Sequence, residues 1–437
     1  MGDNTCVGVT EVLALFSWTA TAYLQESTWR LYHTEDARRH GHDTTLVPLK
    51  PMVTTELEQP AKCQDSRRMI PFTKSLSTVR REESSDPLLS PNRHGYPMGC
   101  GTRCFVAYDH NDGVKPRLVL LKDFWRVASD RRESDVYAKL KTEGVPYIYD
   151  AVIAGDVPGK LQECGADRNG LHRLVHFRVV PSRLGRPITT FASTWQLVKA
   201  LSCAFKAHHQ AFKKARSLHR DVSVGNILID TSTGDGYLID WHIAKSIDDE
   251  APRTHERTES KGTLQFRSGR LLDPDLEPGE ALHKVTDDIE SFVQVLLWIT
   301  LRYVKSGLHF QSRKTFLAYF DSESVAVSKM MLLTNPNAPL SLLSSPHFKS
   351  LLLGLQFHAG LHRAGEDYLP MLREVCADLD QRIERMNTHD WMEDYLDKCL
   401  ANEEWKSTTH DGSEDQMPTL ATKREREEVN RNSQEPK

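Results

Sequence analysis

Hydrophobic residues follow a strand-like spacing in one part of the chain, between residues 95 and 181. RCFVAYD (103–109), PRLVLLK (116–122) and LVHFRVV (174–180) are short apolar runs rich in β-branched and aromatic residues, as β-strands are. The turn-forming HNDG between the first two runs predicts a hairpin. RRESDVYAKLK (131–141) spaces its apolar residues as a short amphipathic helix does. This part is therefore predicted to be a small sheet with one helix.

Beyond residue 185 the apolar spacing becomes helical. TWQLVKALSCAFKAHHQAF (194–212) places apolar side chains at intervals of three and four residues, which predicts one buried helical face. DIESFVQVLLWITLRYV (288–304) is apolar on nearly all sides, as a helix buried in a large core is. This second segment is too short and too interrupted to span a membrane. The face of the first helix comprises Val198, Leu201, Phe205, His208 and Phe212.

The two ends of the chain lack these long patterns. Residues 1–90 contain one helix-like stretch (7–24), followed by a polar run rich in Ser, Arg and Pro that is typical of a linker. Glu11 interrupts the apolar stretch, so that we expect neither a signal peptide nor a membrane span there. Residues 403–437 are polar and charged with almost no aromatic side chains, which predicts a disordered tail.

Composition narrows the class of protein. The chain of 437 residues is long enough for two or three domains or for one large two-lobed domain. A net charge of -4, from 56 basic and 60 acidic residues, gives no reason to expect nucleic acid or a membrane surface as partner. The eight cysteines form no CxxC pair and have no suitably spaced histidines, which argues against a zinc site and a disulfide framework. We therefore expect an intracellular protein, cytoplasmic or nuclear.

The stretch SLHRDVSVGNILIDTSTGDGYLIDWHIAK (217–245) carries the candidate chemistry. Asp221 and Asn226 have the spacing of a loop that supplies a carboxylate for an attacking hydroxyl and an amide oxygen for a metal. NILID and GYLID flank a tight turn and predict a second hairpin, which brings Asp240 back beside Asn226. Oxygen ligands of this kind bind Mg²⁺ together with nucleotide phosphates, so the stretch predicts phosphoryl transfer.

Further parts of such a site lie upstream. Lys122 ends an apolar strand, where a lysine can pair with the α and β phosphates of a nucleotide. Glu133 opens the following helix and can hold that lysine in an ion pair. Gly99, Gly101 and Thr102 precede the hairpin and would let the backbone approach the phosphates closely.

Downstream residues extend the pattern. Gly262 and Thr263 open GTLQF after DDEAPRTHERTESK (248–261), whose charged and hydroxyl-rich composition suits a regulatory activation segment. Asp288 stands at the start of the predicted buried helix. We expect it to cap that helix and to accept hydrogen bonds from the backbone of the loop around Asp221.

Together these motifs resemble the eukaryotic protein kinase superfamily and, more closely, the fungal-type protein kinases. The resemblance rests on LHRDVSVGNILID, GYLIDWHIAK, GTLQF, DDIESFVQVLLWITLRY, LVLLKDFW and ESDVYAKLKTEGVPYI, and covers about residues 95–400. It implies an α+β, two-lobed protein-kinase-like fold with a small β-rich N-lobe (91–181) and a larger, mainly α-helical C-lobe (182–402). An N-terminal extension (1–90) and the charged tail would flank the two lobes.

The resemblance also implies roles for individual residues, in an enzyme that uses ATP and Mg²⁺ to phosphorylate Ser or Thr hydroxyls of an unidentified protein substrate. Asp221 would be the catalytic base, Asn226 and Asp240 the metal ligands, and Lys122 the phosphate-binding lysine paired with Glu133.

Two further sets of residues match the family. Arg220 would meet a phosphate on the activation segment, and a stack of side chains anchored on Asp288 would tie the two lobes together. The hydroxyls that could carry this phosphate are those of Thr254, Thr258 and Ser260. The stacked side chains would be Tyr137, His219 and Trp241.

Three positions depart from the family pattern. Ser223 takes the ATP-facing position at which protein kinases usually carry a lysine that contacts the γ phosphate. The usual APE motif is replaced by SGR (268–270), which reverses a charge, and the usual DFG motif is replaced by DWH, with His242 in place of glycine. We expect His242 to restrict the loop and to hold Asp240 in one pose.

The sequence leaves two alternatives open. Kinases of the aminoglycoside and choline phosphotransferase type share the Asp and Asn spacing and the IDW context, although they typically lack Arg220 and the GT element. A pseudokinase that binds nucleotide as a scaffold would account for the three departures.

Overall fold

The computed structural model divides the chain into two compact units, residues 1–82 with 105–118 and residues 83–104 with 119–437. The predicted helix at 7–24 and the HNDG turn lie outside the described residues, as do Gly99, Gly101, Thr102, Thr254, Thr258 and Ser260. The structure describes residues 47–48, 76–80, 103–109, 117–127, 131–149, 151–162, 174–181, 185–248, 262–273, 282–321, 340–362 and 378–417.

The first unit contains strands that the sequence does not predict. β1 (Val47–Pro48) pairs in parallel with β2 (Leu76–Arg80), and β2 pairs antiparallel with β3 (Arg103–Asp109). Residues 1–90 are predicted as a helix and a linker, because β1 is too short to show a pattern and LSTVR in β2 does not alternate apolar and polar residues. The β2–β3 ladder also joins the N-terminal part to residues 105–109, so the predicted boundary at residue 91 does not coincide with the division into units.

An antiparallel sheet in the second unit carries the upstream part of the candidate site. β4 (Arg117–Val127) pairs with β6 (Leu174–Pro181), with Lys122 opposite Val179, and β6 pairs with β5 (Ala151–Gln162). β4 is the predicted strand 116–122, extended by five residues.

Helix α4 (Glu133–Thr142) confirms the short amphipathic helix predicted at 131–141. It buries Val136, Tyr137 and Leu140 on one face. Its first residue, Glu133, is also buried, which a carboxylate tolerates only with a cationic or hydrogen-bonding partner.

The predicted second hairpin is present. β9 (Ile227–Asp230) pairs antiparallel with β10 (Gly236–Leu238), and β9 pairs on its other side with β7 (Gly185–Pro187). β10 runs so close to helix α5 (Thr194–Ala215) that a Cβ on Gly236 would lie 1.8 Å from the carbonyl oxygen of Ala200. Only glycine fits this contact, which fixes the hairpin on the helix. β8 (Ser217–Leu218), which precedes Asp221, pairs antiparallel with β11 (Lys245–Ser246), which follows Asp240.

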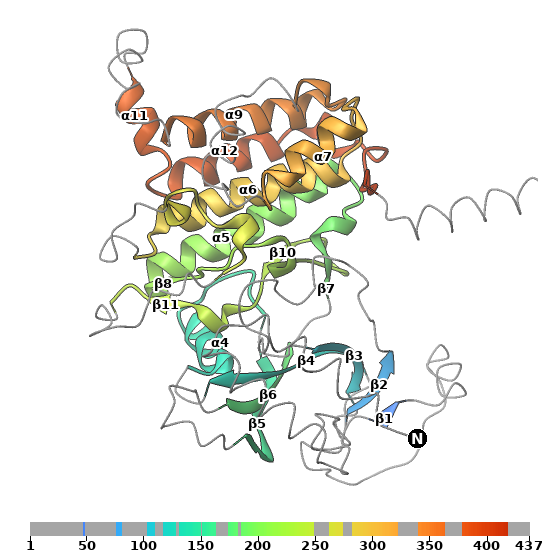
Figure 1. Ribbon diagram of the computed structural model, residues 1–437, viewed down its shortest axis with the longest axis vertical. Coiled ribbons are helices and arrows are strands. Elements are labelled where there is room, and N and C mark those ends of the chain that lie inside the picture. Colours follow the sequence, from blue (N-terminus) through green and yellow to red (C-terminus); the bar gives the residue numbers. More distant parts are fainter. Residues whose placement is uncertain are drawn as a thin grey trace, which may run out of the picture. The chain divides into compact units, whose positions relative to one another are not determined.

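The helices of the second unit pack around α6 (Figure 1). α5 (Thr194–Ala215), α7 (Phe310–Ala318) and α9 (Pro346–His362) each contact α6 (Val285–Tyr303), and α12 (Asp390–Leu400) packs against α5 and α9. α11 (Leu379–Glu384) lies against α9. In the part of the chain that the structure describes, no helix is long and apolar enough to cross a membrane.

Helix α6 begins three residues earlier than predicted. The N-terminal hydrogen bond is made by Asp287, whose carboxylate accepts the backbone N–H of Lys284 at 2.7 Å. The expectation that Asp288 caps the helix is therefore wrong, because Asp288 lies within its first turn and is fully buried. Asp288 is also expected to accept hydrogen bonds from the backbone of the loop around Asp221, which belongs to the candidate site.

The prediction of a disordered tail from residue 403 is wrong for residues 403–417. Helix α13 (Glu403–Lys406) buries Trp405, whose indole N–H donates to the hydroxyl of Thr194 at 2.9 Å. Further along, the carboxylate of Asp411 accepts the backbone N–H of Thr194 at 3.1 Å. Polar composition predicts disorder only when a segment has no large apolar side chain to bury. This segment is ordered because it buries Trp405 and forms hydrogen bonds with the start of α5. Residues 418–437 lie outside the described part.

We predict that Trp405→Ala lowers the free energy of unfolding by about 3–5 kcal/mol, because it removes a fully buried aromatic side chain and leaves a cavity. Urea titration followed by circular dichroism measures the change. Lys406→Ala on the same short helix is the matched control, since Lys406 is exposed. Equal stability of the two variants would show that the segment does not contribute to the core.

Candidate active site

Asp221 and Asn226 are brought together by the short helical turn η4 (Val224–Asn226). The side-chain amide of Asn226 donates to the backbone oxygen of Asp221 at 2.8 Å and to its carboxylate at 3.1 Å. Because the amide nitrogen is used in this way, the amide oxygen of Asn226 is the atom left to face a ligand. An amide oxygen with a nearby carboxylate suits Mg²⁺, which takes few protein ligands and completes its shell with phosphates and water.

Asp240 follows strand β10 in a left-handed conformation, with φ 66° and ψ 57°. The preceding residue, Ile239, donates its N–H to the backbone oxygen of Asn226 at 2.9 Å. The N–H of Asp240 itself donates to the hydroxyl of Tyr137 on α4 at 3.1 Å. The hairpin therefore returns Asp240 to the neighbourhood of Asn226, as the sequence predicts, and a contact with α4 fixes its backbone.

Lys122 connects the sheet, helix α4 and the hairpin. Its ammonium group lies 2.9 Å from the carboxylate of Glu133 and 2.6 Å from that of Asp240. Burial alone would lower the pKa of Lys122, but the charges of Asp240 and Glu133 raise it well above its usual value. The lysine is therefore a permanent cation between the two carboxylates.

His242 donates a second charged hydrogen bond to Asp240. Its Nδ1 contacts the same carboxylate oxygen that Lys122 binds, and it belongs to the turn η5 (Trp241–Ile243). Burial lowers the pKa of His242, but the charge of Asp240 outweighs this and raises it. The pKa of Asp240 lies well below its usual range, because Lys122 and His242 outweigh the opposing effect of burial. The side chain in place of glycine is thus an ion-pair partner of Asp240.

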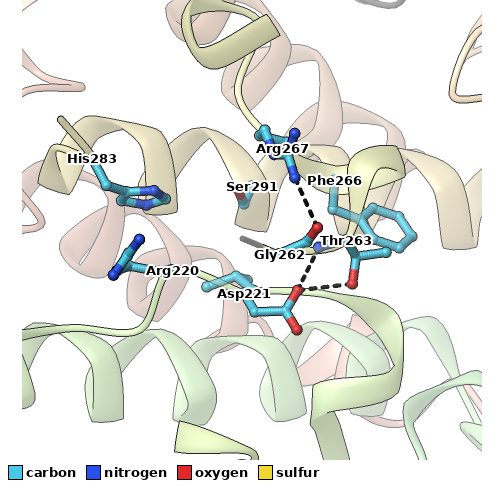
Figure 2. A pocket seen from close by; sticks show the side chains of 9 residues that line it. Arg220, Asp221, Gly262, Thr263, Phe266, Arg267, His283 and Ser291 are labelled. Atoms are coloured by element: carbon cyan, nitrogen blue, oxygen red, sulfur yellow. Dashed lines mark hydrogen bonds between the residues drawn. The ribbon is translucent and has the colours of Figure 1, made fainter. Parts of the chain in front are cut away.

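The GT element holds the carboxylate of Asp221 from the other side (Figure 2). Thr263 donates its backbone N–H and its hydroxyl to one oxygen of Asp221, at 2.7 and 2.8 Å. Gly262 makes this approach possible, since its φ is +105° and a Cβ there would lie 2.6 Å from the backbone oxygen of Arg220. Asp221 is therefore fixed between Thr263 and Asn226.

A small pocket beside Asp221 is lined by basic and imidazole side chains (Figure 2). Arg220 and His283 lie on one side of the pocket, and Arg267 donates to the backbone oxygen of Gly262 at 2.9 Å on the other. The backbone of Arg220 adopts a positive φ of 71°, which turns the loop at this residue. The carboxylate of Asp221 and the side chains of Val222, Phe266 and Ser291 complete the lining, so the pocket joins both signs of charge with apolar groups.

Asp288 accepts hydrogen bonds from the backbone of the loop around Asp221, which confirms that expectation. Its carboxylate receives the N–H of His219 at 3.0 Å and that of Arg220 at 3.2 Å. The imidazole of His219 donates to the backbone oxygen of Ile239 at 2.9 Å, and its ring lies edge-on to Trp241 with centroids 4.5 Å apart. These contacts join the loop to the turn that contains Asp240.

Two of the departures from the expected pattern have well-defined surroundings. Ser223 is buried, and its backbone oxygen accepts the N–H of Asn226 at 3.1 Å, so it shapes the η4 turn. Arg270 pairs with Asp287 at 2.5 Å, and the hydroxyl of Ser268 donates to the same carboxylate at 2.5 Å. The charge at residue 270 is reversed, and its ion pair is made with an acid at the start of α6.

Sequence reasoning missed Asp287 as that partner. A signal was available, because Asp287 and Asp288 form an acidic pair at the beginning of an otherwise apolar helix. It predicted His208 on the buried face of its helix but missed the hydrogen bonds of His208 and His283 to Asp288, since nothing in the spacing of these histidines indicates a shared partner.

Comparison with known protein families gives one match. Residues 156–300, about a third of the chain, match the model of the fungal protein kinase family. The matched region includes Asp221, Asn226, Asp240 and Thr263, whereas Lys122 lies before it. No curated protein matches the chain. The resemblance to fungal protein kinases is thereby confirmed, and it supports a phosphotransferase.

We predict that His242→Gln destabilises the protein more at low pH than at high pH. A raised pKa in the folded state means that the His242–Asp240 pair stabilises fully below about pH 6.5, the unfolded value, and less as pH rises through the folded value. Urea titrations between about pH 6 and pH 9 measure the difference from the unsubstituted protein. His410→Gln, at an exposed position, is the control, and a pH-independent effect of His242→Gln would contradict the ion pair.

Proposed function

We propose that this chain is an ATP-dependent protein kinase that transfers the γ-phosphate of MgATP to a Ser or Thr hydroxyl of a protein substrate. In this proposal the β4–β6–β5 sheet with α4 belongs to a small lobe and the helices around α6 form a large one, with ATP between them. The observation that carries the proposal is the position of Lys122, which binds Glu133 of α4 and Asp240 of the hairpin at once.

Asp221 is the proposed catalytic base. Its carboxylate would accept the proton of the substrate hydroxyl as the oxygen attacks the γ-phosphorus, which is a contribution of about 10²–10⁴-fold for general bases. The hydrogen bonds from Thr263 and Asn226 hold the carboxylate without neutralising it, so that it is oriented before the substrate arrives.

Asn226 and Asp240 are the proposed metal ligands. Magnesium, when bound, would neutralise charge on the phosphate oxygens. The amide of Asn226 is oriented by Asp221, and Asp240 is held by its left-handed backbone and by Tyr137. Asp240 would exchange its contact with Lys122 for the metal, leaving the lysine to Glu133 and the phosphates.

The remaining predicted residues keep their proposed roles. Gly99, Gly101 and Thr102 would let the backbone approach the phosphates. Ser223 would face the γ phosphate at the position where protein kinases usually carry a lysine, so the charged contact of that lysine would be absent. Arg220 would bind a phosphorylated side chain of the 248–261 segment, and the guanidinium of Arg267 lies at the same pocket.

A small-molecule kinase is the first alternative. Such enzymes share the Asp and Asn loop, but they typically lack Arg220 and the GT element, whose Thr263 donates two hydrogen bonds to Asp221 here. The pseudokinase alternative is disfavoured by the intact set of charged contacts around Asp240 and Asp221.

We expect Asp221→Asn to reduce phosphate transfer by about 10²–10⁴-fold, because asparagine keeps the shape of the side chain but accepts no proton. The measurement is incorporation of labelled phosphate from MgATP into the protein itself or into a peptide array. Asp235→Asn, in the turn of the β9–β10 hairpin, is the control, since Asp235 pairs with Lys199 away from the site. Equal labelling by Asp221→Asn would refute its role, and phosphorylation of aminoglycosides or choline, but not of peptides, would favour the small-molecule alternative.

We expect MgATP to raise the melting temperature of the protein, because a ligand at about 100 times its Kd stabilises by about 2.7 kcal/mol. Asp240→Asn should abolish the part of the shift that requires Mg²⁺, and Lys122→Met should weaken binding of nucleotide with or without metal. Differential scanning fluorimetry with ATP, MgATP and MgCl₂ alone separates these effects. No shift at millimolar MgATP would overturn the assignment of a nucleotide site.

A further inference from the structure

A chain of buried side chains runs from the start of helix α12, through α5, to Asp288 on α6. The Nε2 atom of His389 lies 2.7 Å from Nδ1 of His208, and Nε2 of His208 lies 2.8 Å from the carboxylate of Asp288. His389 is 2% exposed, and the other two are fully buried. No function described above uses His389 or His208.

The direction of one hydrogen bond in this chain is fixed by the charge of Asp288. Its pKa lies well below the usual range, because the hydrogen bonds and charges of His283 and His208 outweigh the effect of burial. An ionised carboxylate only accepts, so Nε2 of His208 carries a proton and donates it. The Nδ1 atom of His208 then faces His389.

His389 can satisfy that Nδ1 atom in either protonation state of His208. Burial, followed by the charges of His208 and His209, lowers the pKa of His389 to about 2, so His389 is neutral and has one N–H and one lone pair. It donates to a neutral His208 or accepts from a protonated one. In both cases the Nε2–H of His208 stays directed at Asp288.

We propose that His389 is a positioning residue for the catalytic loop, acting through His208 and Asp288. Asp288 holds the backbone N–H groups of His219 and Arg220, the two residues immediately before Asp221. Rotation of the His208 ring would remove one of the donors that fix the Asp288 carboxylate, and His389 prevents that rotation. The part of the proposal that concerns catalysis rests on the proposed kinase function.

His389 also has packing contacts, which a test must keep separate from its hydrogen bond. Its ring stacks on His209 with centroids 4.6 Å apart and lies 5.3 Å from the ring of Phe205. His209 gives a matched comparison, because it too joins α5 to α12, through a 2.6 Å hydrogen bond to Glu393, but is not on the path to Asp288.

The test compares His389→Phe, which keeps a ring and removes both nitrogens, with His389→Gln, which keeps a donor and an acceptor, and with His209→Phe. Hydrogen exchange of the peptide containing His219 and Arg220 is measured by mass spectrometry. We expect His389→Phe to accelerate exchange of these amides by about tenfold, as the loss of one buried hydrogen bond would. The other two variants should exchange as the unsubstituted protein does.

A kinetic measurement on the same proteins tests the catalytic part. We expect kcat for phosphate transfer to fall by about tenfold in His389→Phe with KM for ATP changed less than about twofold, because the loop that holds Asp221 is loosened and the nucleotide contacts are not. His389→Gln should restore most of kcat. A general loss of stability would instead change both constants and would appear in His209→Phe as well.

The outcomes distinguish this proposal from the proposed function. Unchanged exchange in His389→Phe, or equal acceleration in His209→Phe, overturns the positioning role even if the protein is an active kinase. Accelerated exchange in a chain that transfers no phosphate supports the coupling and refutes only the activity. If His389→Phe does not fold, His389→Asn replaces it, because asparagine suits the residue before a helix but is too short to reach His208.

Discussion

Four hydrogen-bond donors converge on the buried carboxylate of Asp288: two imidazoles, His208 and His283, and the backbone N–H groups of His219 and Arg220. Removing a carboxylate from water is costly unless it is fully hydrogen-bonded, so these donors cannot be given up singly. The requirement ties the loop that carries Asp221 to α6, a helix with nearly all of its residues buried. Because α6 is surrounded by α5, α7 and α9, the loop takes its position from the whole helical core.

A second constraint acts on the opposite side of the loop. Asp240 is buried between Lys122 and His242, and Lys122 also needs Glu133. Three elements that are separated in the sequence thus meet at one point through these ion pairs, and the hydrogen bond from Asp240 to Tyr137 adds to them. If Asp240 held a metal, as proposed, Glu133 would still hold Lys122 in its place.

The sequence predicts the parts of the site that depend on short spacing. Asp221, Asn226 and Asp240 lie within one loop and one hairpin, and Lys122 and Glu133 stand at the end of a strand and the start of the next helix, so local patterns place them. Contacts between distant segments leave no such pattern. Trp405 reaches Thr194 and His389 reaches His208 across about two hundred residues, and a lone aromatic or histidine looks the same whether it is buried or exposed. The first strands were missed because β1 has two residues and the sequence of β2 does not alternate.

The positions that depart from the kinase pattern bear on whether the site is a remnant. In a site that has lost its function, buried charges would be expected to lose partners, since nothing then selects for their arrangement. Here Arg270 binds the buried Asp287, and His242 binds the carboxylate of Asp240. Arg270 and His242 therefore each pair with the carboxylate of a neighbouring aspartate, Asp287 and Asp240. Ser223 differs, because a serine supplies no charge and its side chain is buried in the turn. Of the three departures, only Ser223 removes a contact to the transferred phosphate, so the proposed reaction would depend more heavily on Lys122 and the metal ligands than it does in kinases with a lysine at that position.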